Sequence, residues 1–269
     1  MNYWNAASTG SKNWVSDPMG QLYINSAQGS LSWLRGDLPL AEHQLRKAVK
    51  IANTNSLRPH MHINANELRS QLSQVVFQQG RLVEAEVEAR GAIEKAGIFY
   101  PGAYNYNGNA AAPVSVLAAI LLEQGKLDDA LYLARIAVNM HESSCSEPQS
   151  LGITEARKIW IDAMAEQRNW SGILKLVEAA RTALKEYPDL FQQQFGTSLA
   201  YIEAELNAGD ASRGLQLANT LKTAALKKDG ADSYAAAEIE GILALAEAKL
   251  KQQNAALKGF WGAMPLLVS

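Results

Sequence analysis

The few side chains that could do chemistry are isolated from one another along the chain. The single cysteine, Cys145, follows His141 by four residues in the segment HESSCSEPQS, and a cysteine next to a histidine could form a nucleophilic dyad. The segment offers neither an oriented base nor an oxyanion hole. We therefore interpret Cys145 as a structural or neutral thiol.

The sequence also contains few residues or motifs that could bind a metal or a cofactor. His60 and His62 flank Met61, but a pair of histidines two residues apart is weak evidence for a metal site. One cysteine cannot form an internal disulfide framework or a multi-cysteine site. The sequence contains no glycine-rich phosphate loop and no GxSxG or HExxH motif. We predict no catalytic site, no metal site and no cofactor.

Composition excludes several classes of partner. The chain has 269 residues, 48% of them hydrophobic and 19% charged, with a net charge of −2. Because phosphate neutralisation needs clustered cations, this balance argues against nucleic-acid binding. No apolar run approaches the roughly 20 residues of a membrane span. We expect no nucleic acid and no membrane partner, and a cytoplasmic location, or a periplasmic one if a targeting segment has been removed. The oligomeric state is left open.

An alanine-rich pattern recurs along the chain and indicates helical hairpins. In QQGRLVEAEVEARGAI (residues 78–93), Leu82, Ala85 and Ala89 lie on one helical face after Gly80. Related patterns follow five other turn positions at intervals of 41 to 45 residues, which gives the series Gly36, Gly80, Gly125, Arg168, Gly209 and Lys251. The residue five places after the turn is usually small, because the second helix must approach the first closely.

These features predict an all-α fold, a right-handed α-solenoid of about six helical hairpins. The expected bounds are an irregular segment at 1–15 and a solenoid over 16–269, with repeats at approximately 16–52, 61–97, 111–141, 153–187, 190–226 and 233–267. Ser16 or Asp17 is expected to cap the first helix, with Pro18 in its first turn. Turn-rich connectors are expected at 52–66, 99–113 and 141–152.

The register resembles that of the tetratricopeptide repeat (TPR). The 34-residue form of that repeat has a small residue at position 8 and Gly, Ala and Ala at positions 15, 20 and 27. The three sets that match are Gly36, Ala41 and Ala48, with Gly29 at position 8; Gly80, Ala85 and Ala92; and Gly125, Ala130 and Ala137. Each unit is longer by roughly 7 to 11 residues. HEAT and armadillo repeats share this longer period, but the turn glycine with its trailing alanines favours the TPR.

A narrower resemblance concerns the closing segments. FQQGRLVEAEVEARGAIEKAG, LAAILLEQGKLDDALYLARIAV and the final 35 residues resemble the repeats that precede the protease-like domain of bacterial CHAT proteins, a caspase-related family associated with TPRs. The final repeat of that family runs into an A-x-P-L-L-like segment, matched by Ala263, Pro265, Leu266 and Leu267. The apolar ending MPLLVS is expected either to fold back on the sixth repeat or to have been followed by a segment that was removed.

The TPR resemblance implies a partner-binding groove on the first helix of each hairpin. Its positions are occupied here by Ser26, Ser30 and Trp33, by Ser70, Gln74, Phe77 and Gln78, by Ser115 and Glu123, and by Lys158, Asp162 and Glu166. This mixture suits a peptide backbone with aromatic anchors. It lacks the Lys/Arg cluster that clamps a carboxylate-terminated peptide. Alternatively, Trp33 and Phe77 simply pack between neighbouring hairpins.

The leading functional hypothesis is a non-catalytic scaffold that binds a protein or peptide partner. The CHAT resemblance implies that it is the regulatory repeat domain of a larger protease-like protein. The alternative is a peptide or small-molecule sensor module of another bacterial regulator. A solenoid enzyme such as a cell-wall lyase is disfavoured, because no segment is left for a lysozyme-like domain once six repeats are counted.

Overall fold

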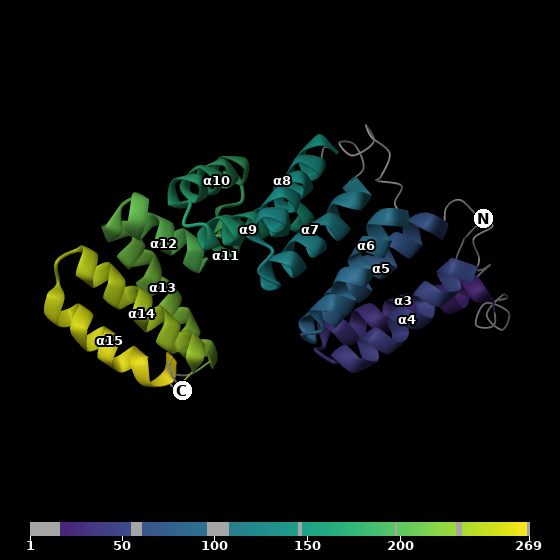
Figure 1. Ribbon diagram of the computed structural model, residues 1–269, viewed down its shortest axis with the longest axis horizontal. Coiled ribbons are helices and arrows are strands. Elements are labelled where there is room, and N and C mark those ends of the chain that lie inside the picture. Colours follow the sequence, from purple (N-terminus) through teal and green to yellow (C-terminus); the bar gives the residue numbers. More distant parts are fainter. Residues whose placement is uncertain are drawn as a thin grey trace. The chain divides into compact units, whose positions relative to one another are not determined.

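The regular structure of this protein is helical. The computed structural model describes residues 17–54, 61–95, 108–144, 147–196, 198–229 and 233–267. Within these ranges it contains helices and no strand (Figure 1), which confirms the predicted all-α fold. The predicted irregular segment 1–15, His60 and Cys145 lie outside the described residues.

The chain divides into two compact units, residues 1–146 and residues 147–269. The helices of the first unit are α3 (Pro18–Leu34), α4 (Leu38–Thr54), α5 (Met61–Gln78), α6 (Leu82–Lys95), α7 (Gly108–Glu123) and α8 (Leu127–Ser143). They pair as three hairpins, α3 with α4, α5 with α6 and α7 with α8 (Figure 1). The first helices α3, α5 and α7 also contact one another in succession, so they form one face of this unit.

The second unit also contains three hairpins. Its helices are α9 (Leu151–Glu166), α10 (Trp170–Ala183), α11 (Pro188–Gln194), α12 (Leu199–Ala208), α13 (Ala211–Asp229), α14 (Tyr234–Lys249) and α15 (Gln253–Leu267). The hairpins are α9 with α10, α12 with α13 and α14 with α15, and the first helices α9, α12 and α14 again contact one another in succession. The short helix α11 precedes the middle hairpin of this unit.

Helix ends follow from local sequence, with some departures from the expected connectors. The Asp17 carboxylate accepts hydrogen bonds from the amides of Met19 and Gly20 at 3.2 and 3.4 Å, which confirms the cap ahead of Pro18. The connectors expected over 52–66 and 99–113 end earlier than predicted, because α5 begins at Met61 and α7 at Gly108. His141 was also expected in a connector but lies in α8, where it is buried.

Five of the six turns share one geometry. Each has three residues between its helices, and the middle one is left-handed, with φ of 79°, 77° and 73° at Gly36, Gly80 and Gly125, 56° at Arg168 and 62° at Lys251. Its amide and the next amide donate to carbonyls three and five residues earlier, which is a Schellman motif. The turns predicted at Arg168 and Lys251 from the pattern of the residues that follow them are therefore confirmed.

The fifth turn differs from the other five. Only Gly209 and Asp210 separate α12 from α13, and Gly209 has φ of −116°. The Glu205 carboxylate accepts a hydrogen bond from the Asp210 amide at 3.1 Å. A side chain at Gly214 would meet Leu206 of α12, because an added Cβ would lie 2.6 Å from a Leu206 methyl carbon. The glycine at position 214 is therefore explained by the close packing of α13 on α12, and not by the turn.

The predicted small residues form the core of the hairpins. The following alanines have 0% exposure: Ala41, Ala48, Ala85, Ala89, Ala92, Ala130, Ala134 and Ala137. In α15, Ala256 and Ala263, which follow the turn at Lys251 by five and twelve residues, are buried. Phe260, nine residues after this turn at the position that Ala89 and Ala134 occupy in other hairpins, is 38% exposed, and Gly259 is buried beside Ala244 of α14.

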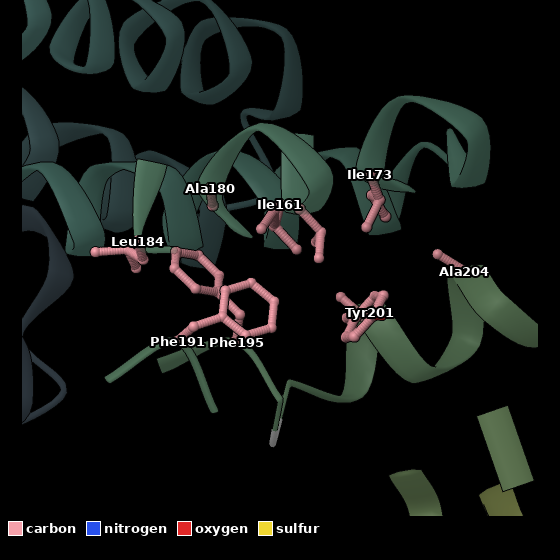
Figure 2. Close-up of a cluster of buried hydrophobic side chains, with 10 residues drawn as sticks. Ile161, Ile173, Ala180, Leu184, Phe191, Phe195, Tyr201 and Ala204 are labelled. Carbon is pink, nitrogen blue, oxygen red and sulfur yellow. The ribbon is translucent and has the colours of Figure 1, made fainter. Parts of the chain in front are cut away.

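Aromatic side chains fill part of the core of the second unit. Figure 2 shows Phe191 and Phe195 beneath α10, with Tyr201 of α12 beside them. The two phenylalanine rings have centroids 5.6 Å apart and are tilted by 30°. Phe195, directly after α11, is completely buried, so packing fixes the end of this short helix.

Candidate partner-binding surfaces

The first helices of the first unit carry a row of linked polar side chains. The Ser30 hydroxyl of α3 donates to the Gln71 side-chain oxygen of α5 at 3.3 Å. The Trp33 indole Nε1 donates to the Gln78 side-chain oxygen at 2.8 Å. These bonds join corresponding faces of successive hairpins, and the bond to Gln78 orients the Trp33 ring, which is half-buried.

The predicted groove residues of the first unit differ in accessibility. Ser26, Gln74 and Phe77 are half-buried, like Ser30 and Trp33, whereas Gln78 and Glu123 are exposed. Ser70 and Ser115 are buried, with 4% and 5% exposure, so neither offers its hydroxyl to a partner. Ser115 instead donates to the Ala111 carbonyl one turn earlier in α7.

The other three predicted residues belong to the second unit. Lys158, Asp162 and Glu166 lie on α9 and are exposed. The predicted set is thus divided between the two units. The face of α3, α5 and α7, called here the amide face, carries Ser26, Ser30, Trp33, Gln71, Gln74, Phe77 and Gln78. The face of α9, α12 and α14, called here the acidic face, is built around Glu166, Glu203 and Glu238 and also carries Lys158 and Asp162.

Three carboxylates on successive helices interact on the acidic face. The pKa of Glu203, on α12, is raised above its ordinary value first by burial and then by the negative charges of Glu238 on α14 and Glu166 on α9. A cation placed among these side chains would relieve that repulsion. The Lys249 ammonium donates to the Asn207 side-chain oxygen at 3.3 Å, which links α14 to α12 on the same register positions.

Glu203, Asn207 and Glu238 are absent from the residues proposed from sequence. The repeat register does indicate Glu203, however, because it precedes the turn at Gly209 by six residues. Asp162 precedes Arg168, and Gln74 precedes Gly80, by the same number. Extending the same register to the fifth and sixth hairpins would have found them. Gln71 lies outside the five groove positions of the TPR and had no such signal.

The second helices of the first unit are joined by a different set of contacts. Glu42 on α4 forms ion pairs with Arg81 at the next turn and with Arg46 on its own helix, and it accepts a hydrogen bond from Gln79 at 3.0 Å. The hydrogen bond from Arg81 is the main reason that the pKa of Glu42 falls from 4.5 to about 2. Gln79 also donates to the Leu38 carbonyl at 3.3 Å.

The next hairpin repeats this arrangement 44 to 45 residues later. Glu86 forms ion pairs with Lys126 at 3.1 Å and Arg90 at 2.8 Å, and Gln124 donates to the Leu82 carbonyl at 3.4 Å. Burial raises the pKa of Glu86, but hydrogen bonds from Arg90, Gln124 and Lys126 outweigh it and lower the pKa to about 2. Together these contacts form a clamp between successive hairpins of the first unit.

The hairpins of the second unit are joined mainly by apolar packing, with fewer polar contacts among the described residues. Arg181 of α10 donates to the Tyr201 hydroxyl at 2.9 Å and lies 4.3 Å from the centre of the Phe191 ring. Burial, together with a hydrogen bond to Glu205, raises the pKa of Tyr201 to about 12. Lys222 of α13 forms an ion pair with Glu240 of α14.

Two other kinds of feature are absent from the described part of the chain. There, no group of three or more His, Cys, Asp or Glu side chains is placed to hold a metal ion. Likewise, none of the described helices combines the length and the apolar character needed to cross a membrane.

Comparison with solved structures supports the TPR-like architecture. The chain is similar to the apo form of RapI, with a TM-score of 0.67 and 12% identity over 98% of this chain and 88% of that one. It is similar to aspartyl phosphate phosphatase F from Bacillus subtilis, with a TM-score of 0.63 and 14% identity over 97% and 74% of the two chains.

A third similarity is to a variant of the nearly identical TPR-like repeats of a Podosopora anserina putative kinesin light chain. Its TM-score is 0.53, at 12% identity over 76% of this chain and 95% of that one. No protein-family model and no curated protein matches the sequence. At these identities the similarity concerns the fold, and it confirms a TPR-like helical solenoid.

Proposed function

We propose that this chain is a non-catalytic scaffold that binds an extended peptide segment of a partner protein. The observation that carries the proposal is the acidic face, where Glu166, Glu203 and Glu238 extend from three successive first helices, and where the pKa of Glu203 is raised first by burial and then by the charges of the other two. Like charges gathered on one face are unfavourable unless a cation joins them. The proposed partner segment therefore carries Lys or Arg side chains.

The amide face supports the same proposal through a different chemistry. Side-chain amides can donate to and accept from a peptide backbone, and Gln74 and Gln78 stand one turn apart on α5. Phe77 and Trp33 are half-buried and supply apolar surface between them. The alternative was that Trp33 and Phe77 pack between neighbouring hairpins. It holds in part, because the hydrogen bond from Trp33 to Gln78 joins Trp33 to the next hairpin. A half-buried ring can do both.

The acidic face is tested with labelled poly-lysine and poly-glutamate peptides of equal length, titrated against the protein by fluorescence anisotropy. We expect binding of poly-lysine alone, weakened by salt because the attraction is between partly exposed charges. Combining Glu166→Gln with Glu203→Gln should weaken it about tenfold. Glu178→Gln is the matched control, because Glu178 is an exposed carboxylate on α10, outside this face. Equal affinity for the two peptides would overturn the proposed selectivity.

The amide face is tested by capture of a partner from cell extract. Trp33→Ala and Phe77→Ala should each reduce capture, whereas Tyr132→Ala, an exposed aromatic residue on α8, should not. Equal capture by the wild type and both groove variants would remove Trp33 and Phe77 from the binding surface.

The sequence resemblance to CHAT proteins supports a finer form of the proposal. In a longer protein, these repeats would regulate a protease-like domain that follows them. A peptide held across several first helices favours one stacking of the hairpins, and that preference can be passed to an attached domain. Sequencing the coding region beyond Ser269 tests this form. A downstream Cys/His protease-like domain would support it, and a different regulatory domain would favour the sensor alternative.

A further inference from the structure

A cavity of about 340 Å³ lies between the first two hairpins of the first unit. Leu72 of α5 and Glu88 of α6 form one side of it. The other side belongs to α4, where residues three and four apart share a helical face, and it is formed by Arg46, Val49, Lys50, Asn53 and Thr54. The volume lies within the range of small-molecule sites. None of these residues belongs to the amide face or the acidic face, so the cavity is a separate feature.

The cavity combines an apolar floor with a polar rim. Val49 and Leu72 are 9% and 1% exposed, so they form the floor. Lys50, Asn53 and Thr54 are exposed and form the rim. An apolar group of a ligand would be removed from water against the floor, while its polar group would remain at the rim. The cavity therefore suits an amphipathic small molecule.

The carboxylates beside the cavity are already neutralised by arginines. Glu88, which lines the cavity, accepts a hydrogen bond from Arg69 Nε at 2.9 Å. It belongs to a network of ion pairs that joins Arg46, Arg69 and Arg81 with Glu42, Glu84 and Glu88. Three guanidinium groups thus balance three carboxylates, and the network adds no net charge to the cavity.

Two cationic groups at the cavity can still donate hydrogen bonds. No described residue forms a hydrogen bond or an ion pair with the Lys50 ammonium group. Arg46 uses Nε and Nη2 to bind Glu42 and Glu84, whereas its Nη1 lies 3.6 Å from Glu88, which is too far for a hydrogen bond. Because the network is balanced, the cavity carries the one positive charge of Lys50.

We infer that this cavity binds a small organic acid, with its carboxylate at Lys50 and Arg46 and its apolar body against Val49 and Leu72. Hydrogen bonds from cationic donors to a carboxylate are stronger than bonds between neutral groups. A neutral ligand would leave the charge of Lys50 unbalanced, and an amine would add a second cation beside it. The end of a peptide chain offers the same carboxylate, but a cavity of this size can hold a small acid whole.

A bound acid would contact both hairpins that meet at the cavity. Its walls come from α4 on one hairpin and from α5 and α6 on the next, and Arg46 is also part of the clamp that joins them. Because only the folded protein forms this site, the acid should raise the melting temperature of the first unit. This inference does not depend on the proposed peptide binding, which uses other residues.

The head group is tested with phenylacetate, phenethylamine and 2-phenylethanol, which share an aromatic ring and differ in charge. Each is titrated against the full chain and followed by ligand-observed NMR. Phenylacetate should bind at least about tenfold more tightly than the other two. Equal affinity of the three compounds would overturn the inference. An N-acetylated Gly-Gly-Phe peptide with a free carboxylate is compared in the same way. If it bound more tightly than phenylacetate, the cavity would be assigned to a chain end and not to a small acid.

Three variants locate the site. Lys50→Gln should weaken phenylacetate binding about tenfold and leave poly-lysine binding unchanged, so this test is separate from that of the acidic face. Lys47→Gln is the matched control, because Lys47 is exposed on α4 but does not line the cavity. Thr54→Trp should abolish binding by filling the cavity, and circular dichroism establishes that each variant is folded. Unchanged binding by Lys50→Gln, equal loss in Lys47→Gln, or binding that survives Thr54→Trp would overturn the assignment.

Discussion

The two units use the same repeat register but join their hairpins in different ways. Six residues after the turn, the first unit has Glu42 and Glu86, and both carboxylates pair with a cation of the next hairpin. At the same position the second unit has Leu174 and Leu215, which pack on apolar clusters. The repeat fixes where successive hairpins meet, and the side chains at that place decide whether charge or apolar burial holds them.

Because of this difference, the stability of the two units should respond differently to pH and to loss of core volume. Ion pairs between partly exposed side chains contribute about 0–1 kcal/mol each and weaken when the carboxylate is protonated. Apolar burial contributes about 25 cal/mol per Å² and does not titrate. We expect the first unit to be the acid-sensitive part of the chain and the second unit to be the part that is most sensitive to loss of core volume.

The largest expected effect is in the aromatic core of the second unit. Phe195→Ala should destabilise that unit by about 3–5 kcal/mol, because Phe195 is fully buried and its removal leaves a cavity. Hydrogen exchange followed by mass spectrometry should show faster exchange in α10 to α12, and not in α3 to α6. The control is Phe260→Ala at an exposed ring. A uniform loss of protection in both units would contradict their independence.

The corresponding test in the first unit adds volume instead of removing it. Ala85→Leu should destabilise by about 1–3 kcal/mol, because Ala85 is fully buried and its carbonyl accepts a hydrogen bond from Ser73 at 2.8 Å across the hairpin. Thermal unfolding measures the loss. Val83→Leu, on the exposed side of the same helix, should be nearly neutral. An unchanged melting temperature for Ala85→Leu would count against the assigned register.

The charged clamp predicts that the stability of the first unit falls at low pH. Because the pKa of Glu42 is about 2 in the folded protein and 4.5 ordinarily, its stabilisation is fully present above about pH 4.5 and is lost as the pH falls toward 2. Glu42→Gln should cost about 1 kcal/mol at pH 7, since its cationic partners are about two-fifths exposed. The loss should vanish near pH 2 when melting is compared across pH.

The pH dependence of stability expected from Glu203, in the second unit, has the opposite sign to that expected from Glu42, and it serves as the comparison. Its pKa is raised, so its contribution to stability is present below the ordinary pKa and is lost as the pH rises through the folded value. Glu203→Gln should therefore raise the melting temperature at pH 7 and leave it nearly unchanged at low pH. If both Glu variants shift melting in the same direction at pH 7, the electrostatic contrast between the units is wrong.

The smallest expected effect concerns the turns. Arg168→Gly should stabilise the second unit by about 0.5–1 kcal/mol, because a left-handed backbone is unfavourable for residues with a side chain. Gly80→Ala should destabilise the first unit by a similar amount, although an added Cβ would meet no atom within 4 Å. Denaturant unfolding measures both. Equal stability of all variants would show that these turns are not strained.

Much of the helical architecture followed from spacing alone. The turns at Arg168 and Lys251 were located without a glycine, because the small residues that follow them kept the register. The shorter turn at Gly209 could not be predicted, since it depends on the Glu205 side chain binding the Asp210 amide. Nor could the outward position of Phe260, because Gly259 next to it takes the buried place.

The candidate binding surfaces were predicted in part. Register identified Gln74, Gln78 and Glu166, which lie on the first helices as expected. It also selected Ser70 and Ser115, which are buried, because position along a helix does not report how closely the neighbouring helix packs. The sequence pattern gives no sign of the division of the chain after residue 146, so the residues assigned to one groove belong to two units.

The turns at Arg168 and Lys251 are suitable positions for two spin labels whose separation can be measured. Both positions are exposed, and each already carries a side chain in the left-handed backbone, so Arg168→Cys and Lys251→Cys add no new conformational demand. With Cys145 replaced by serine, nitroxide labels at these two sites would report the separation between the first and last hairpins of the second unit. Pulsed electron spin resonance could then follow, in ångströms, how far the stack lengthens or shortens when a basic peptide is added.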